Sequence, residues 1–217
     1  ASDLARFGQA GPKHGSAPDG GSTDFLHLYV GWGDAMASCV LCDPWSAHEA
    51  LRLGLVNDIF PVLKVDGEFV PNPLVVTDRY LDKWGKIIHG KPKEGEDLQA
   101  AKVQLKAGTV DFSMLDAGVD AMLTKILYTM PDCTLKTTES VRKKKLEHWD
   151  QNKESNRAWL SLKMMTEAKA GFQAFHRGSR EVGREVDFVD LRRRLAAGET
   201  WGDELIEAVS PQYKSDS

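Results

Sequence analysis

The sequence predicts a mixed α/β protein with three consecutive regions. Residues 1–61 combine a leading strand, a glycine-rich loop, short helices and a second strand in a tight α/β unit. Residues 62–113 are punctuated by proline and glycine and have the character of an exposed insertion, whereas residues 114–217 are mainly helical. A hydrophobic content of 41% supports a real core and excludes wholesale disorder.

The first region is organised around a turn-rich loop at 7–23. Its glycines and prolines favour a loop path between a strand predicted at 4–9 and a helix predicted at 25–30, which Thr23 and Asp24 can cap. Backbone amides in such a loop are free to meet a ligand, although an ordinary surface connection has the same composition.

Two further helices and a strand complete the first region. A short apolar helix is predicted at 34–42, and Ser46 with Glu49 forms a capping-box pattern at the start of the next helix. The apolar run 55–60, stopped by Pro61, predicts a buried strand.

The remaining regions give a hairpin and a series of helices. Asp66 and Gly67 between apolar flanks predict a small hairpin. The expected helices lie at 78–88, at 115–130, from Pro131 onward, at 150–175 as the longest, at 187–197 and at 203–209. The tryptophans at 149, 159 and 201 are expected to be packing residues.

The beginning of the chain predicts a longer protein. Ala1 is not methionine, and the strand expected at 4–9 has no earlier strand with which to pair. Because an unpaired strand leaves backbone donors and acceptors unsatisfied, we expect this chain to be the back part of a larger one.

Composition excludes several classes of partner. The formal net charge of −4 gives no general electrostatic case for nucleic acid or an anionic membrane. The sequence has no apolar run of the roughly 20 residues that a membrane span needs, and no secretory signal pattern. The odd count of three cysteines indicates a reducing cytoplasm.

Two other patterns favour structural roles. Cys39 and Cys42 have metal-ligand or redox spacing, but without a second pair they are expected to be core cysteines, and no metal site is predicted. The basic runs 142–145 and 192–194 have no interleaved aromatic residues and are typical of solvated helix faces, with phosphate binding by one of them as the alternative.

The strongest candidate chemistry lies in the glycine-rich loop. His14 and Asp19 share it, and a histidine beside a carboxylate in a partly dry pocket can activate water as a general base. Ser16 is a candidate hydrogen-bonding partner, since no nucleophile-elbow motif marks it as an activated nucleophile.

Four stretches of the chain together resemble the crotonase (enoyl-CoA hydratase/isomerase) superfamily. They are FGQ at 7–9, GPKHGSAPDGG at 11–21, YVG at 29–31 and SAHEALRLGLVNDIFP at 46–61. The opening is most similar to the branch that contains dihydroxynaphthoyl-CoA synthase and alicyclic ring-opening hydrolases. The resemblance implies the C-terminal part of a crotonase-like spiral fold, followed by a helical trimerisation region.

The resemblance also implies an acyl-CoA substrate, with no separate cofactor because CoA is part of the substrate, and a homo-oligomer, either a trimer or a dimer of trimers. The family holds the thioester oxygen with two backbone amides, an oxyanion hole for an enolate. Both amides are expected to precede Ala1, so we expect this chain to be inactive alone.

Individual positions carry over from the family pattern. Gly11 stands where hydratases have a catalytic glutamate, which argues against simple enoyl-CoA hydration. Gln9 and Gly11 are expected to hold an anion such as bicarbonate, or water, and Gly20 is expected to contact substrate. Ser16 and Asp19 resemble the synthase pattern GS-x-D, with Pro18 adding one residue.

Two phenylalanines resemble the segment that covers the CoA adenine, often that of a neighbouring subunit. They are Phe175 and Phe188, although His176 and Arg177 replace the Lys-Arg that ends this motif in the family. The two are therefore predicted substrate-binding residues.

The implied reaction is the ring opening of an alicyclic β-oxoacyl-CoA by two waters, as in anaerobic degradation of benzoyl-CoA. Asp19 is predicted to be the principal base, with His14 assisting it. The alternatives are a dihydroxynaphthoyl-CoA synthase-like lyase and a catalytically inactive scaffold subunit.

Overall fold

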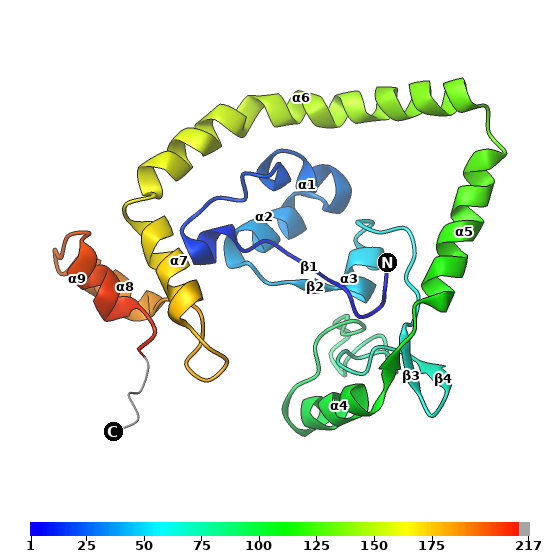
Figure 1. Cartoon of the computed structure of the whole chain (residues 1–217), viewed down its shortest axis with the longest axis horizontal. Coiled ribbons are helices and arrows are strands. Elements are labelled where there is room, and N and C mark those ends of the chain that lie inside the picture. The colour runs from blue at the N-terminus through cyan, green and yellow to red at the C-terminus, as the bar shows by residue number, and fades with distance from the viewer. Residues whose placement is uncertain (213–217) are drawn as a thin grey trace. The chain divides into compact units, whose positions relative to one another are not determined.

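A computed structural model describes residues 1–212, apart from the side chains at positions 148 and 150–152 (Figure 1). The last five residues of the region predicted at 114–217 lie outside this part. The chain mixes helices with short strands, so the predicted α/β class is confirmed. Its contacts divide it into a first unit, residues 1–8 and 43–144, and a second unit, residues 9–42 and 145 onward.

The first unit begins with a small antiparallel ladder. Strand β1 (Arg6–Phe7) pairs with β2 (Trp45–Ser46), so the leading strand is shorter than predicted and does have a partner. Helix α3 (Ala47–Arg52) follows directly. Its capping box is confirmed, because the Glu49 amide donates to Ser46 Oγ at 3.2 Å and the Ser46 amide donates to Glu49 Oε2 at 3.1 Å.

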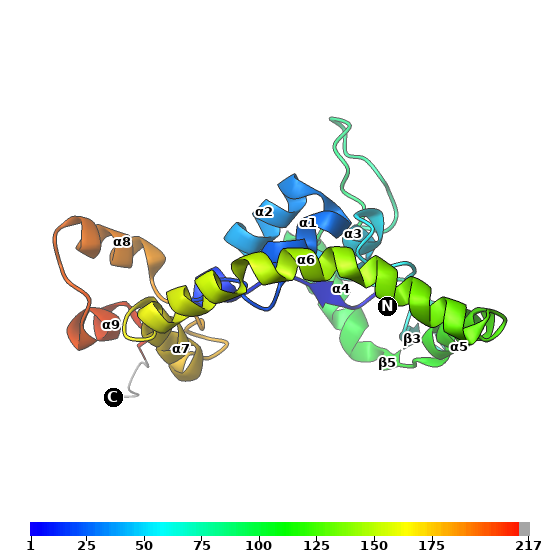
Figure 2. The same ribbon diagram turned by 90° about the horizontal axis from the view of Figure 1, so that it is seen from above.

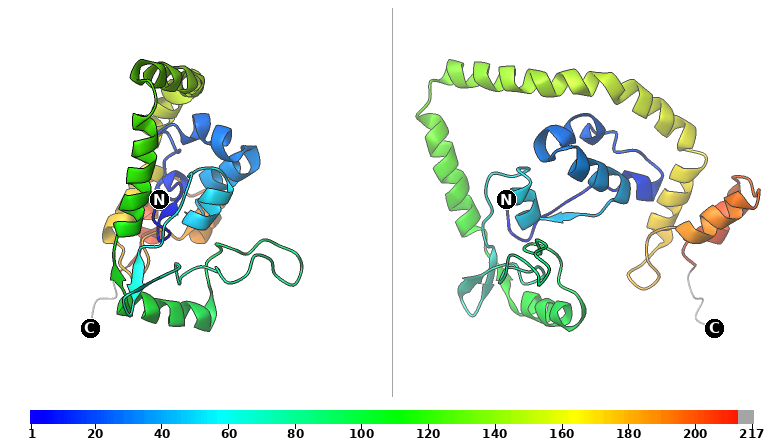
Figure 3. Two further views of the ribbon diagram at one scale, coloured as in Figure 1. Left: turned by 90° about the vertical axis from the view of Figure 1, so that its right-hand side faces the viewer. Right: turned by 180° about the vertical axis from the view of Figure 1, so that it is seen from behind.

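A three-stranded sheet forms the other part of the first unit. Strands β3 (Leu63–Val65) and β4 (Glu68–Val70) form the predicted hairpin, with Asp66 at φ 52° and Gly67 at φ 84° in the turn. Strand β5 (Thr109–Val110) pairs with the other edge of β3. Helix α4 (Gly95–Ala107), which is not among the helices predicted from the sequence, contacts β3 (Figure 3). Helix α5 (Ser113–Leu127) follows the sheet.

A buried carboxylate joins the first residues of the chain to the rest of the first unit. Asp3 accepts hydrogen bonds from the amides of Asn72, at 2.8 Å, and Val62, at 3.3 Å. The Asn72 side chain donates in return to the Asp3 carbonyl at 2.8 Å. Burial nevertheless raises the pKa of Asp3, since removal of the carboxylate from water outweighs these donors.

The strand predicted at 55–60 is wrong. Within this run only Phe60 makes a bridge, to Ser2. The Leu55 amide instead donates back to the Ala50 carbonyl at 2.9 Å, and the Ile59 amide donates to the adjacent Asp58 carboxylate at 2.8 Å. Local acceptors therefore take the donors that a ladder would need.

The helix predicted at 78–88 is also wrong. The Asp82 carboxylate accepts from the amides of Trp84 at 2.8 Å and Lys86 at 2.9 Å, which closes a turn. An antiparallel bridge joins Leu81 to Ile87 beside it. The segment is an irregular hairpin that projects past α3 (Figure 2).

One long helix replaces the two predicted between residues 131 and 175. Helix α6 (Pro131–Lys163) runs for 33 residues, and helix α7 (Glu167–Arg177) follows after a short turn. The sequence from 132 to 170 contains neither proline nor glycine, so no residue breaks the helix near position 150.

As far as residue 212, the second unit contains five further helices. They are the 3₁₀ helix η1 (Gly11–His14), α1 (Ser22–Val30), α2 (Trp32–Leu41), α8 (Phe188–Ala196) and α9 (Asp203–Val209). The predicted terminal helices are confirmed. The predicted cap of α1 by Thr23 and Asp24 is wrong, because both lie inside the helix, and Gly21 at φ 102° precedes it.

The core of the second unit lies among α7, α8 and α9. Its buried residues are Ala170, Ala174, Val186, Leu205, Ile206 and Val209. Phe188, Leu191, Leu195 and Trp201 pack against this cluster and are themselves partly exposed. This arrangement fixes the α8 face that lines the cavity described below.

Candidate functional site

The candidate site begins where η1 meets α7. Gly15 ends η1 at φ 74°, and a Cβ atom there would lie 2.1 Å from the Glu167 carbonyl carbon. A Cβ atom on Gly171 would lie 2.4 Å from the backbone carbonyl carbon of His14. Only glycine permits this approach, so the two glycines set the position of the loop on α7.

This contact brings two of the predicted site residues together. The His14 ring lies edge-on to Phe175, with 5.4 Å between the ring centroids. His14 Nδ1 is buried and has no hydrogen-bond partner among the described residues. Because an unsatisfied buried nitrogen costs about 1–3 kcal/mol, a hydrogen-bonding group supplied by substrate or water would bind there favourably.

The loop then folds back on itself. The Ser16 amide donates to the Gly11 carbonyl at 2.9 Å, and a Cβ atom at Gly11 would lie 2.8 Å from the Ser16 carbonyl oxygen. A glutamate at position 11 would therefore require another loop path. Ser16 Oγ donates to the Ala17 carbonyl at 2.9 Å.

The predicted base lies at the far side of this loop. The Asp19 amide donates to the Ala17 carbonyl at 2.8 Å, while its half-buried carboxylate makes no hydrogen bond or ion pair with the described residues. Gly20 is exposed, and a Cβ atom there would meet nothing within 4 Å. Gln9 is half-buried at the entry to the loop.

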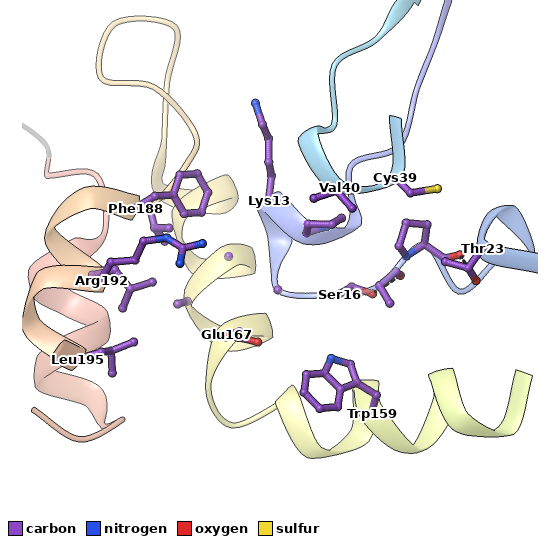
Figure 4. A pocket seen from close by; sticks show the side chains of 18 of the residues that line it. Lys13, Ser16, Thr23, Cys39, Val40, Trp159, Glu167, Phe188, Arg192 and Leu195 are labelled. Atoms are coloured by element: carbon purple, nitrogen blue, oxygen red, sulfur yellow. Dashed lines mark hydrogen bonds between the residues drawn. The ribbon is translucent and has the colours of Figure 1, made fainter. Parts of the chain in front are cut away.

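An open cavity of about 510 Å³ lies within the second unit (Figure 4). Phe188, Arg192 and Leu195 line it from α8, Trp159 from α6, Cys39 and Val40 from α2, and Lys13 and Ser16 from η1 and its loop. Of the predicted site residues, Ser16 and Phe188 line the cavity. The others lie outside its lining: Gln9, Gly11, His14, Asp19, Gly20 and Phe175.

Two basic side chains of this cavity were not singled out from the sequence. Lys13 forms an ion pair with Glu185 at 3.0 Å, whereas Arg192 makes no hydrogen bond or ion pair with the part of the chain that the structure describes. The neighbouring Arg193 and Arg194 both pair with Asp190. The sequence shows 192–194 only as a basic run. The direction in which each side chain leaves α8 distinguishes Arg192, which lines the cavity, from its two paired neighbours.

The cysteines of α2 are not arranged for reactivity. Cys42 is buried, and burial, followed by the nearby Cys42, raises the pKa of the Cys39 thiol. Among the described residues, no cluster of three histidine, cysteine or acidic side chains has the geometry of a metal site. No helix in residues 1–212 is long and apolar enough to cross a membrane.

The first third of the chain, which includes the glycine-rich loop, matches a known family. Residues 1–72 match the family described as enoyl-CoA hydratase/isomerase. The resemblance to the crotonase superfamily is therefore confirmed, and the match includes the whole glycine-rich loop and the α3 capping box.

Three curated relatives narrow the comparison further. Each is a 6-oxocyclohex-1-ene-1-carbonyl-CoA hydrolase. The protein from Thauera aromatica is 55% identical over 99% of this chain and 57% of its own length. The protein from Geobacter metallireducens is 55% identical over 97% of this chain and 55% of its own length. The protein from Syntrophus aciditrophicus is 42% identical over 96% of this chain and 56% of its own length.

The chain thus spans little more than half the length of the curated relatives that it matches. No solved structure matches it.

Proposed function

We propose that this chain is part of a ring-opening hydrolase that converts 6-oxocyclohex-1-ene-1-carbonyl-CoA and two waters into 3-hydroxypimeloyl-CoA, in anaerobic degradation of benzoyl-CoA. The observation that carries the proposal is the 42–55% identity, over nearly the whole chain, to hydrolases named for this substrate. Gly11 favours it over simple hydration, because the loop has no room for the hydratase carboxylate.

The proposed chemistry uses one enolate twice. The first water adds to the ring double bond conjugated to the thioester, and the second attacks the ring ketone. The carbon–carbon bond then breaks with the same enolate as leaving group. One preorganised oxyanion hole stabilises both enolates, so a single site serves both steps.

The proposal assigns proton transfer to the glycine-rich loop. Asp19 is the principal base, since its carboxylate is half-buried and is not engaged by any described residue. His14 orients water through the buried Nδ1 atom that lacks a partner in the described part of the chain.

The 510 Å³ cavity is proposed to receive part of the CoA moiety. Arg192 supplies a guanidinium for a phosphate group, and Phe188 supplies an aromatic face for the adenine. CoA enters as part of the substrate, and no separate cofactor is proposed.

A homo-oligomer, a trimer or a dimer of trimers, is proposed as the working state. Helix α5 and the turn after it carry several exposed apolar side chains, namely Met122, Ile126, Leu127, Tyr128 and Met130. Tyr128 and Leu127 are 88% and 81% exposed in the single chain, which an interface would cover.

The test replaces Asp19 by Asn in the complete protein. Removal of a general base lowers turnover by about 10²–10⁴-fold, while the dissociation constant of the CoA ester should change little. Asp34→Asn is the matched control, because Asp34 is exposed on α2. Near-normal turnover of the Asp19→Asn protein would remove Asp19 from the mechanism.

Assays of the unaltered complete protein distinguish the alternatives. Ring opening of the cyclic oxo-ester without activity on the dihydroxynaphthoyl-CoA synthase substrate supports the hydrolase. The reverse result would establish the lyase, and no turnover of either ester would establish the inactive scaffold.

A further inference from the structure

Residues 76–91 form an arm in the first unit that is tied at its base and exposed at its tip (Figure 2). The Val76 amide donates to the Lys91 carbonyl at 2.9 Å, and the Gly90 amide donates to the Val76 carbonyl at 2.7 Å. Trp84, at the tip, is 81% exposed. Its base residues Val76 and Gly90 are buried, whereas residues 78–81 and 83–87 are exposed, so few core contacts hold the outer part of the arm.

The arm rests on α3 through one ring contact, one hydrogen bond and one ion pair. The His48 and His89 rings meet edge to face with 5.0 Å between centroids. Arg52 Nη1 donates to the His89 carbonyl at 3.0 Å, and Lys91 Nζ lies 2.5 Å from Glu49 Oε1. The Tyr80 ring stacks on the His89 ring, with 5.7 Å between the ring centroids.

The surroundings of His48 disfavour a positive charge on its ring. Its Nε2 atom is buried and has no partner among the described residues. The titratable groups on the elements packed around it are Arg52 and Glu49 of α3, Tyr80, His89 and Lys91 of the arm, and Arg6 of the adjoining β1. Three of these six side chains, those of Arg52, Lys91 and Arg6, carry a permanent positive charge. The carboxylate of Glu49 is already engaged by Lys91 and Arg52.

We propose that the arm at 76–91 is an acid-released element, docked on α3 while His48 is neutral and freed when His48 takes up a proton. This role is independent of the proposed hydrolase activity.

The direction in which pH changes the docking of the arm follows from the surroundings of His48 in the docked state. Burial, and then the charge of His89, lower the pKa of His48 in the docked state below its ordinary value of 6.5. The free arm returns His48 to water, where it binds a proton more readily. Docking is therefore fully present above the ordinary imidazole pKa and weakens as the pH falls below it.

The size of the effect has an upper limit. If only the freed state binds the proton, the docking equilibrium shifts by about tenfold between about pH 7.5 and about pH 5.5. The measurement is hydrogen–deuterium exchange of the 217-residue chain at both pH values. Exchange rates of the unfolded chain at each pH serve as the reference, so that the pH dependence of the chemical exchange rate is removed.

The expected result is a loss of protection that is confined to the arm. His48→Gln should abolish the acid response. His48→Phe provides a second non-titrating side chain if circular dichroism shows that the Gln variant does not fold. His176→Gln, an exposed position on α7, should keep the response.

Three results would overturn the proposal. They are equal protection of the arm at both pH values, an acid response that persists when His48 is replaced, and a loss of protection shared with α8 and α9, which would mean general acid unfolding.

Discussion

The glycine at position 171 offers a direct test of the contact that positions the candidate loop. In Gly171→Ala the new methyl group would lie 2.4 Å from the His14 carbonyl carbon and 2.5 Å from its oxygen. Favourable carbon contacts lie at about 3.5–4.0 Å, so η1 and α7 must separate by about 1 Å. The clash is with backbone atoms, which have no rotamer into which to move.

The free-energy balance can be worked from two opposing effects. Glycine to alanine inside a helix stabilises by up to about 1 kcal/mol, whereas overpacking costs about 1–3 kcal/mol. We expect Gly171→Ala to lose about 1–2 kcal/mol of unfolding free energy. Gly33→Ala is the matched control, because it also lies in a helix and its new Cβ atom would meet nothing within 4 Å, so it should gain up to about 1 kcal/mol.

The assay is urea unfolding followed by circular dichroism, with hydrogen exchange of the α7 amides to locate the change. Loss of protection should concentrate in α7 and in η1, where the contact is made. Equal unfolding midpoints for the two alanine variants would refute the close approach of His14 to α7.

Three further predictions follow from other parts of the structure. Ser46→Ala should destabilise the chain by about 1 kcal/mol, measured by urea unfolding, because α3 loses its N-terminal cap. Cys39, with its raised pKa, should react with iodoacetamide more slowly at neutral pH than the exposed Cys133, as read by peptide mass spectrometry; equal rates would contradict the burial of that thiol. Arg192→Gln should weaken CoA-ester binding, measured by calorimetry, by roughly tenfold. Arg193→Gln is the control and should change the affinity little, because it removes a guanidinium already paired with a carboxylate. Equal effects of the two substitutions would remove Arg192 from the proposed phosphate contact.

Local signals in the sequence were reliable where the decisive atoms lie close together along the chain. The Ser46 capping box and the Asp66–Gly67 turn each depend on neighbours within a few residues, and both are present. The runs at 55–60 and 78–88 have suitable apolar patterns, yet Asp58 and Asp82 accept the backbone donors instead. Composition does not reveal which acceptor prevails.

In the candidate site, too, features set by neighbouring residues could be predicted and features set by distant residues could not. The loop that carries His14 and Asp19 could be recognised from its glycines. The contact of His14 with Phe175 depends on Gly171, which is distant in the sequence and looks like any other helical glycine. The role of Arg192 in the cavity lining depends on the position of α8, which no short motif records.

The pairing of β1 with β2 has a consequence for how the chain can be divided. Phe7 lies opposite Trp45, and a Cβ atom on Gly8 would lie 3.0 Å from the Pro44 Cα atom, so the chain leaves the first unit and re-enters it at almost the same point. Residues 9–42 are thus an insertion between the two strands of a hairpin. A two-residue turn joining positions 8 and 43 would close the β1–β2 ladder without them. The insertion packs instead with residues from 145 onward, so a cut at any single peptide bond leaves at least one unit with only part of its residues.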